Sequence, residues 1–262
     1  GNLQPRRPYP QYVSVGALLN DGNAIWHSLQ AKLEHRWRNG LLIQTAYTWS
    51  KLIDDIDGPS RANAAPYQDV YNLRADRGIG GYDTPHRFVA SYVYQVPLGR
   101  GGKLLTDTPV VKEVIGGWQF SGITEFQVGL PMQVTQNFTA WGPNTQRPNL
   151  VAGADPSLAH GDRTLSHWFN TAAFVASQNL TLGYAPRFPL HGPGINNWDL
   201  ALMRDFRVRE RMKMQFRTEA YSAMNHPQWG SPGTSLNNLN TFGVVNSAAG
   251  ARQIELALRI FY

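Results

Sequence analysis

The fold is decided by the last stretch of the chain, Ala251–Tyr262, which reads A-R-Q-I-E-L-A-L-R-I-F-Y. On one face of an extended chain it places five apolar or aromatic side chains, Ile254, Leu256, Leu258, Ile260 and Tyr262. The other face carries Gln253, Glu255, Ala257 and Arg259. Alternation with a period of two residues predicts a β-strand with one apolar and one polar face.

Composition limits how such a chain can meet a membrane. The protein has 262 residues and a mean hydropathy of −0.36, and it lacks an apolar run long enough for a transmembrane helix. A transmembrane barrel remains possible, because only every second residue of its strands meets lipid. The 8 Trp and 11 Tyr suit a membrane interface, although they also suit a sugar-binding surface. The absence of Cys excludes disulfides and thiolate metal sites.

Further segments alternate in the same way and are long. They cover residues 25–37, 41–50, 86–97, 118–128, 197–208 and 212–220, with a weaker candidate at 12–19. Strands of soluble proteins have about five or six residues, whereas crossing a bilayer takes roughly 9–11. The sequence therefore predicts an all-β fold, an antiparallel transmembrane β-barrel segment of about eight long strands.

Connections between these segments alternate in length. The short ones are 38–40, 98–117 (with a possible helical turn at 110–115) and 209–210, and the long ones are 51–85, 131–195 and 222–250. Transmembrane barrels have short periplasmic turns and long extracellular loops, whereas a β-sandwich follows no such rule. We therefore expect all long connections to emerge at one end of the sheet.

The alternation also assigns the two faces. We expect lipid to meet the face that carries Tyr47, Trp49, Tyr92, Phe126, Phe216 and Leu256. The interior should be lined by Gln44, Arg87, Glu125, Arg217 and Glu255. Four basic residues break the rule on the lipid face, namely His27, His35, Lys51 and Arg204. A basic residue costs about 2–4 kcal/mol at the bilayer midplane but only about 0–1 kcal/mol near an interface, so these residues must lie near the strand ends or snorkel.

Short motifs follow one another along the chain. They are Tyr47-Thr48-Trp49-Ser50-Lys51 with Asp54-Asp55, Asn72-Leu73-Arg74-Ala75-Asp76-Arg77-Gly78 with Asp83-Thr84-Pro85-His86-Arg87-Phe88, Trp168-Phe169-Asn170-Thr171-Ala172-Ala173-Phe174, Gly192-Pro193-Gly194 with Asn197 and Asp199, Glu219-Ala220-Tyr221 with Asn225-His226-Pro227, and Phe242-Gly243 with Ala251-Arg252-Gln253-Ile254. In this order they resemble the Oar-like group of TonB-dependent outer-membrane transporters. The resemblance implies a barrel of about 22 strands with an N-terminal plug. Residues 1–262 would then be the C-terminal portion of the barrel, with the plug domain and the N-terminal strands absent.

The resemblance also implies partners and a location. The chain would lie in the bacterial outer membrane, in contact with its lipid, and would take part in uptake of a bulky solute. The TonB complex would act through the missing N-terminal part. The barrel-assembly machinery would read the closing strand as an assembly signal, through Ile254, Leu256, Leu258, Ile260 and the terminal Tyr262. The basic residues are scattered along the chain, so no nucleic-acid partner is expected.

Other chemistry is weakly indicated. No Walker, G-x-S-x-G or dinucleotide-binding motif is present, so we expect neither an enzyme nor a cofactor. Asp54, Asp55 and Asp57 offer oxygen ligands for a cation, but their spacing fits no complete calcium loop, and a solvated loop is the default interpretation. A charged loop network is expected from Arg74, Asp76, Arg77, Asp83 and Arg87, and it is more easily read as a tether between loops than as a ligand site. Gly78, Gly80 and Gly81 predict a flexible loop.

Two alternatives to the transporter remain at this point. One is a free-standing small outer-membrane barrel of about eight strands that acts as a scaffold or adhesin. The other is a soluble β-rich carbohydrate-binding or hydrolytic domain that uses its aromatic residues as stacking platforms. Burial of the aromatic face between two sheets would favour the soluble domain.

Overall fold

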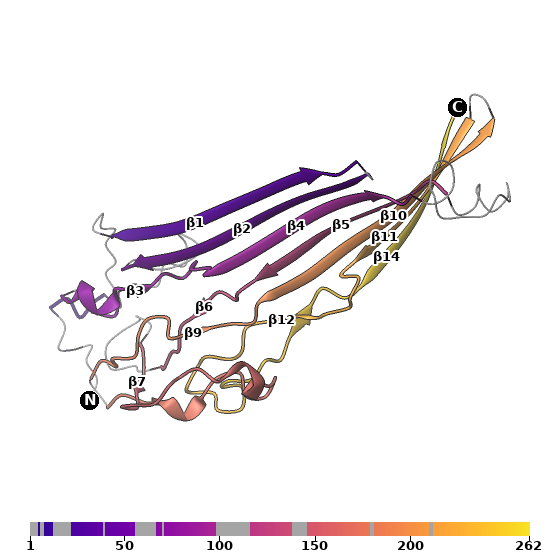
Figure 1. Ribbon diagram of the computed structural model, residues 1–262. Coiled ribbons are helices and arrows are strands. Elements are labelled where there is room, and N and C mark those ends of the chain that lie inside the picture. The colour runs from indigo at the N-terminus through magenta and orange to yellow at the C-terminus, as the bar shows by residue number, and fades with distance from the viewer. Residues whose placement is uncertain are drawn as a thin grey trace.

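The computed structural model describes residues 5, 8–12, 22–38, 40–55, 67–69, 71–97, 116–137, 146–178, 181–209 and 212–262. These residues form an eight-stranded antiparallel sheet with long loops gathered at one of its ends (Figure 1). The sheet order is β1-β2-β4-β5-β10-β11-β14, and β3 pairs with β2 outside this path. No helix in the described part is long and apolar enough to cross a membrane.

The main strands are long, as predicted. They are β1 (Ala24–Arg36), β2 (Leu41–Asp54), β4 (His86–Gln95), β5 (Trp118–Gln127), β10 (Ile195–Arg209), β11 (Met212–Tyr221) and β14 (Gln253–Phe261). Their lengths range from 9 residues in β14 to 15 in β10. The expected strand at 12–19, apart from Tyr12, and the expected helical turn at 110–115 lie outside the described residues.

Short elements occupy the long connections. They are β3 (Gly78–Ile79), β6 (Pro131–Met132), β7 (Asn149–Leu150), β8 (Phe174–Val175), β9 (Leu190–His191), β12 (Gln228–Trp229), β13 (Ala248–Ala249) and the 3₁₀ turns η2 (Leu73–Asp76), η3 (His160–Asp162) and η4 (Thr171–Ala173). The prediction of a flexible glycine loop at 78–81 was wrong for Gly78, because Gly78 pairs with Asp54 in β2. A paired segment of two residues is too short to produce a periodic signal in the sequence.

Strand register confirms the two faces. Directly opposed residues of antiparallel strands lie on the same face of a sheet. Tyr47 opposes Phe88, which opposes Phe126, and Phe216 opposes Leu258 in the same way. The apolar face therefore continues across the sheet without a slip of one residue, which would have reversed the faces. It is not covered by a second sheet, since Trp49 stays 55% exposed, and this argues against the soluble-domain alternative.

The ends of the sheet also differ as predicted. The described parts of connections 55–85, 128–194 and 222–252 lie at the left end of the sheet in Figure 1. At the right end, β1, β4 and β10 end, β2, β5 and β11 begin, and the C-terminus lies nearby. The connection between β4 and β5 is much longer than a hairpin turn, and residues 98–115 of it lie outside the described residues.

The hydrophobic core lies in the long loops rather than against the sheet. Its buried members are Met132, Val134, Phe169, Ala173, Phe174, Ala185, Leu190 and Phe242. Three of its rings pack edge to face, with centroids 5.1 Å apart for Phe169 and Phe242 and 5.9 Å apart for Phe169 and Phe174. The segment expected to be irregular therefore forms a packed cap, which the connection 222–252 completes.

Candidate functional site

An aromatic band crosses the apolar face near its loop end. The Tyr47 hydroxyl lies 2.8 Å from Nδ1 of His86, and the two rings stack. Phe88 stacks on Phe126, and Phe126 meets Trp198 edge to face at 5.7 Å. The band thus joins β2, β4, β5 and β10. Aromatic side chains in this position are typical of a barrel at the membrane–water interface.

A second band lies at the other end of the same face. Trp118 meets Phe216 edge to face, and the Arg204 guanidinium lies 4.4 Å from the centroid of the Phe206 ring. From Trp198 to Phe206 the strand advances about 26 Å at roughly 3.3 Å per residue, or about 20 Å in height at a tilt of roughly 40°. This approaches the roughly 25 Å apolar band of outer-membrane barrels. Arg204 therefore lies at an interface, where its charge is tolerated.

The remaining basic residues of this face also lie near strand ends. Lys51 Nζ is 3.2 Å from Oδ2 of Asp83, and His27 lies directly opposite Lys51 at the loop end of the sheet. His35 lies at the opposite end of β1, where its ring packs edge-on against Trp37 at 4.2 Å. These basic residues therefore lie near strand ends, as predicted for basic residues on the lipid face.

The polar face carries paired side chains. Arg87 Nη2 lies 2.8 Å from Oε1 of Glu125 on the neighbouring strand, and Arg217 pairs with Glu219 on its own strand. Gln95 donates to the Oε1 of a glutamine on β5 at 2.6 Å. Arg87 thus belongs to the wall of the sheet and not to the loop network predicted for it. Such a face is suited to a water-filled or polar interior.

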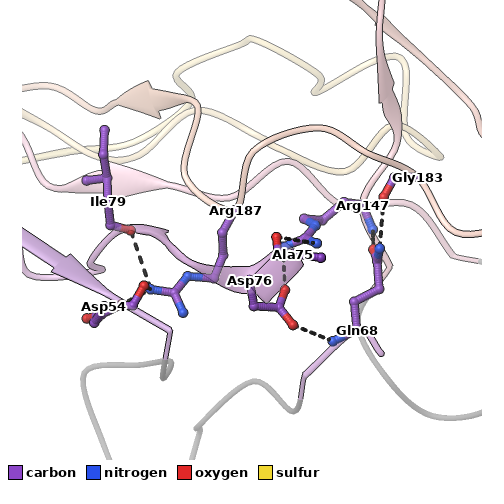
Figure 2. A network of polar contacts seen from close by, with 8 residues as sticks. All are labelled: Asp54, Gln68, Ala75, Asp76, Ile79, Arg147, Gly183 and Arg187. Carbon is purple, nitrogen blue, oxygen red and sulfur yellow. Dashed lines mark hydrogen bonds and ion pairs between the residues drawn. The ribbon is translucent and has the colours of Figure 1, made fainter. Parts of the chain in front are cut away.

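Within the loop connections, Figure 2 shows a buried ion pair between Asp76 and Arg147. Arg147 Nη1 lies 2.5 Å from Asp76 Oδ1, and the two side chains are 3% and 5% exposed. Gln68 completes the arrangement, because its backbone N–H donates to Asp76 and its side chain bonds the backbone of both Arg147 and Gly183. Connection 55–85 is thereby tied to connection 128–194.

A second buried pair ties the same loop segment to the sheet (Figure 2). Arg187 pairs with Asp54 at the end of β2 and also donates to the carbonyl oxygen of Ile79 at 3.5 Å. Burial lowers the pKa of Arg187 to about 10, so the guanidinium remains charged at neutral pH. Asp55 accepts instead from the backbone N–H of Asn23 at 2.6 Å. The aspartates considered for a cation therefore have protein partners, except Asp57, which lies outside the described residues.

Asp83 is a third anchor of the loops. Its carboxylate accepts the backbone N–H of Leu52 at 2.6 Å and the ammonium of Lys51, and Nε2 of His191 lies 3.8 Å away. Burial lowers the pKa of His191, and the nearby Asp83 opposes this shift in part.

The predicted network is therefore assembled with other partners. Asp76 and Asp83 hold Arg147 and Lys51, whereas Arg74 contributes its backbone carbonyl to the N–H of Arg77. Sequence reasoning missed Arg147 and Arg187, because each is a single arginine far along the chain from its aspartate. Within the described residues, no group of three or more His, Cys, Asp or Glu could hold a metal ion.

The predicted assembly signal is the outer edge of the sheet. β14 pairs with β11 on one side, and its apolar face is exposed, with Leu256 at 71%. Tyr262 follows directly after this strand and is also exposed. At the opposite edge of the sheet, β1 pairs only with β2 among the described residues.

Sequence comparison places this arrangement in a known class. A family model described as an outer membrane beta barrel domain matches residues 1–255. The chain belongs to this family, and its location is the outer membrane. No curated protein and no solved structure matches the chain.

Proposed function

We propose that this chain is the C-terminal barrel portion of a TonB-dependent outer-membrane transporter of the Oar-like group. Such a transporter imports a bulky solute by an energy-coupled movement of its plug. The proposal is carried by the open sheet, in which β1 and β14 form opposite edges (Figure 1) and do not pair with each other in the described part of the chain. A transmembrane barrel leaves no open edge, so further strands must complete it.

The charge pairs of the polar face favour a large barrel over a small one. A barrel of about eight strands has an interior that its own side chains fill. Here the polar face spans the main strands and carries charge pairs such as Arg87–Glu125, which suit contact with water or with a polar body inside a wide lumen. The motif series supports the particular group, because it follows the order of the Oar-like transporters over nearly the whole chain.

The proposed partners follow from this assignment. Outer-membrane lipid contacts the apolar face, and the barrel-assembly machinery receives the closing strand. The TonB complex acts through an N-terminal part of the same protein, and an unidentified solute passes through the lumen. Catalysis and nucleic-acid binding have no part in this function.

The experiment that tests the proposal captures the full-length protein from outer membranes after crosslinking in living cells. An antibody against the loop segment 146–178 would serve, because this segment lies in the loop cap. We expect a protein far larger than 29.3 kDa that crosslinks to TonB. A heat-modifiable protein of 29.3 kDa without a TonB crosslink would contradict the proposal and favour the small barrel.

A further inference from the structure

A groove of about 200 Å³ opens on the apolar face between β1 and β2, at the loop end of the sheet. It is lined by His27, Ser28, Leu29, Trp49, Ser50 and Lys51. The groove lies apart from the polar face and from the buried pairs of Arg147 and Arg187. Because it opens on the surface that meets the membrane, a lipid molecule can reach it directly.

Cross-strand pairs arrange the lining by polarity. His27 and Lys51 lie opposite each other at the loop end, and the next pair on this face toward the membrane centre is Leu29 and Trp49. This order matches an amphiphile with a charged headgroup above an acyl chain. Trp49 also continues the aromatic band that marks the headgroup level of the membrane.

The ammonium of Lys51 is fixed in place before any lipid binds. Lys51 Nζ lies 3.2 Å from Oδ2 of Asp83. The Asp83 side chain is 0% exposed, whereas that of Lys51 is 47% exposed. The carboxylate is buried and the Lys51 side chain is partly exposed, so the ammonium, which has three N–H donors, can bind a second partner. A lysine acts on phosphate as a point charge with several donors, and the facing histidine offers a further ring nitrogen.

We propose that this groove binds an outer-leaflet lipid whose headgroup carries a phosphate monoester. The phosphate contacts Lys51 and His27, and one acyl chain lies along Leu29 and Trp49. The inference rests on the orientation proposed above, with the long loops outside, but does not depend on coupling to TonB. It gives a ligand to two of the four basic residues of the lipid face, His27 and Lys51.

Native mass spectrometry of the full-length protein in detergent tests this site. Phosphatidic acid is the probe, phosphatidylcholine with the same acyl chains tests the headgroup, and inorganic phosphate tests the acyl chain. His27→Gln should weaken phosphatidic acid binding several-fold, and His27→Gln with Lys51→Gln should weaken it at least tenfold. Lys32→Gln, on the polar face of the same strand, is the matched control and should change nothing.

Three results would overturn the site. One is unchanged phosphatidic acid binding in the His27→Gln variant, which keeps the contact between Lys51 and Asp83 and so tests the site without disturbing the loops. Another is phosphatidylcholine binding as tight as phosphatidic acid binding, which would indicate ordinary boundary lipid. A third is full displacement by inorganic phosphate at equal concentration, which would indicate an anion site without an acyl contribution. Heat modifiability of each variant confirms that the barrel is folded.

Discussion

Replacing Asp76 by Asn should release connection 128–194 from connection 55–85 and so open the loop cap. The change keeps the shape of the side chain but removes the charge that compensates Arg147, whose side chain is 3% exposed. Breaking a buried ion pair by removing one partner costs about 3–5 kcal/mol, because the other charge stays buried without compensation. At about 1.4 kcal/mol per tenfold change, the population of the opened loop cap should rise about 100- to 4,000-fold.

An exposed pair supplies the control. Lys32 and Glu34 lie 3.5 Å apart with side chains 61% and 60% exposed. Exposed pairs contribute about 0–1 kcal/mol, so Glu34→Gln should raise the opened population by about fivefold at most. Combining Asp76→Asn with Arg147→Met should cost less than the sum of the two single changes, since the double variant leaves no unpaired charge.

The opened population can be measured by thiol labelling, because the chain contains no Cys. A single Cys at Ala185, which is 2% exposed in the loop core, becomes reactive only when the cap opens. Labelling should be fast in the Asp76→Asn variant and near the wild-type rate in the Glu34→Gln variant. Equal rates in these two variants would refute the assignment of the buried pair as the tether of the loops.

Three further outcomes are expected. Leu256→Arg on the lipid face should lower the free energy of unfolding in lipid vesicles by about 2–4 kcal/mol, whereas Ala257→Arg on the polar face should change it by less than about 1 kcal/mol, as measured by urea titration. Deleting Tyr262 should lower the amount of heat-modifiable protein in outer-membrane fractions, while Glu255→Gln should not, and normal amounts after the deletion would mean that the strand carries no assembly signal. Burial lowers the pKa of His191 below 6.5, so the opened cap binds a proton more tightly than the closed one. The closed loop cap should therefore become less stable as the pH falls below about 6.5, and thiol labelling at position 185 should become faster. His191→Gln should remove this pH dependence of the labelling rate.

The sheet was predictable because its signal is local and repeated. Alternation runs through most of β14 and of the β10–β11 hairpin, with exceptions such as Arg204, and it assigns most side chains to a face. Tyr47, Phe88 and Phe126 were placed on one face from the sequence, and the register brings them directly opposite one another. The alternation of short and long connections gave the two ends of the sheet.

The buried ion pairs and the hydrophobic core of the long loops could not be predicted from such a periodic signal. Asp76 and Arg147 are separated by 71 residues, and Arg187 lies 133 residues from Asp54, so no spacing rule connects them. Phe169 and Phe242 meet through irregular backbone, where hydrophobic residues follow no period. Asp76 and Asp83 could be recognised from the sequence as charged loop residues. The arginines expected to pair with them were their neighbours in the chain, because a sequence alone does not show which distant residues meet.

In the membrane, one face of this sheet meets lipid and the other meets water. This assignment can be tested in membranes with single Cys residues, which are placed in turn at positions 254–259 of the full-length protein and then spin-labelled. Accessibility should alternate, with labels at Leu256 and Leu258 accessible to oxygen and labels at Glu255 and Ala257 accessible to a water-soluble nickel complex. Equal accessibility along the strand, or the opposite alternation, would contradict it.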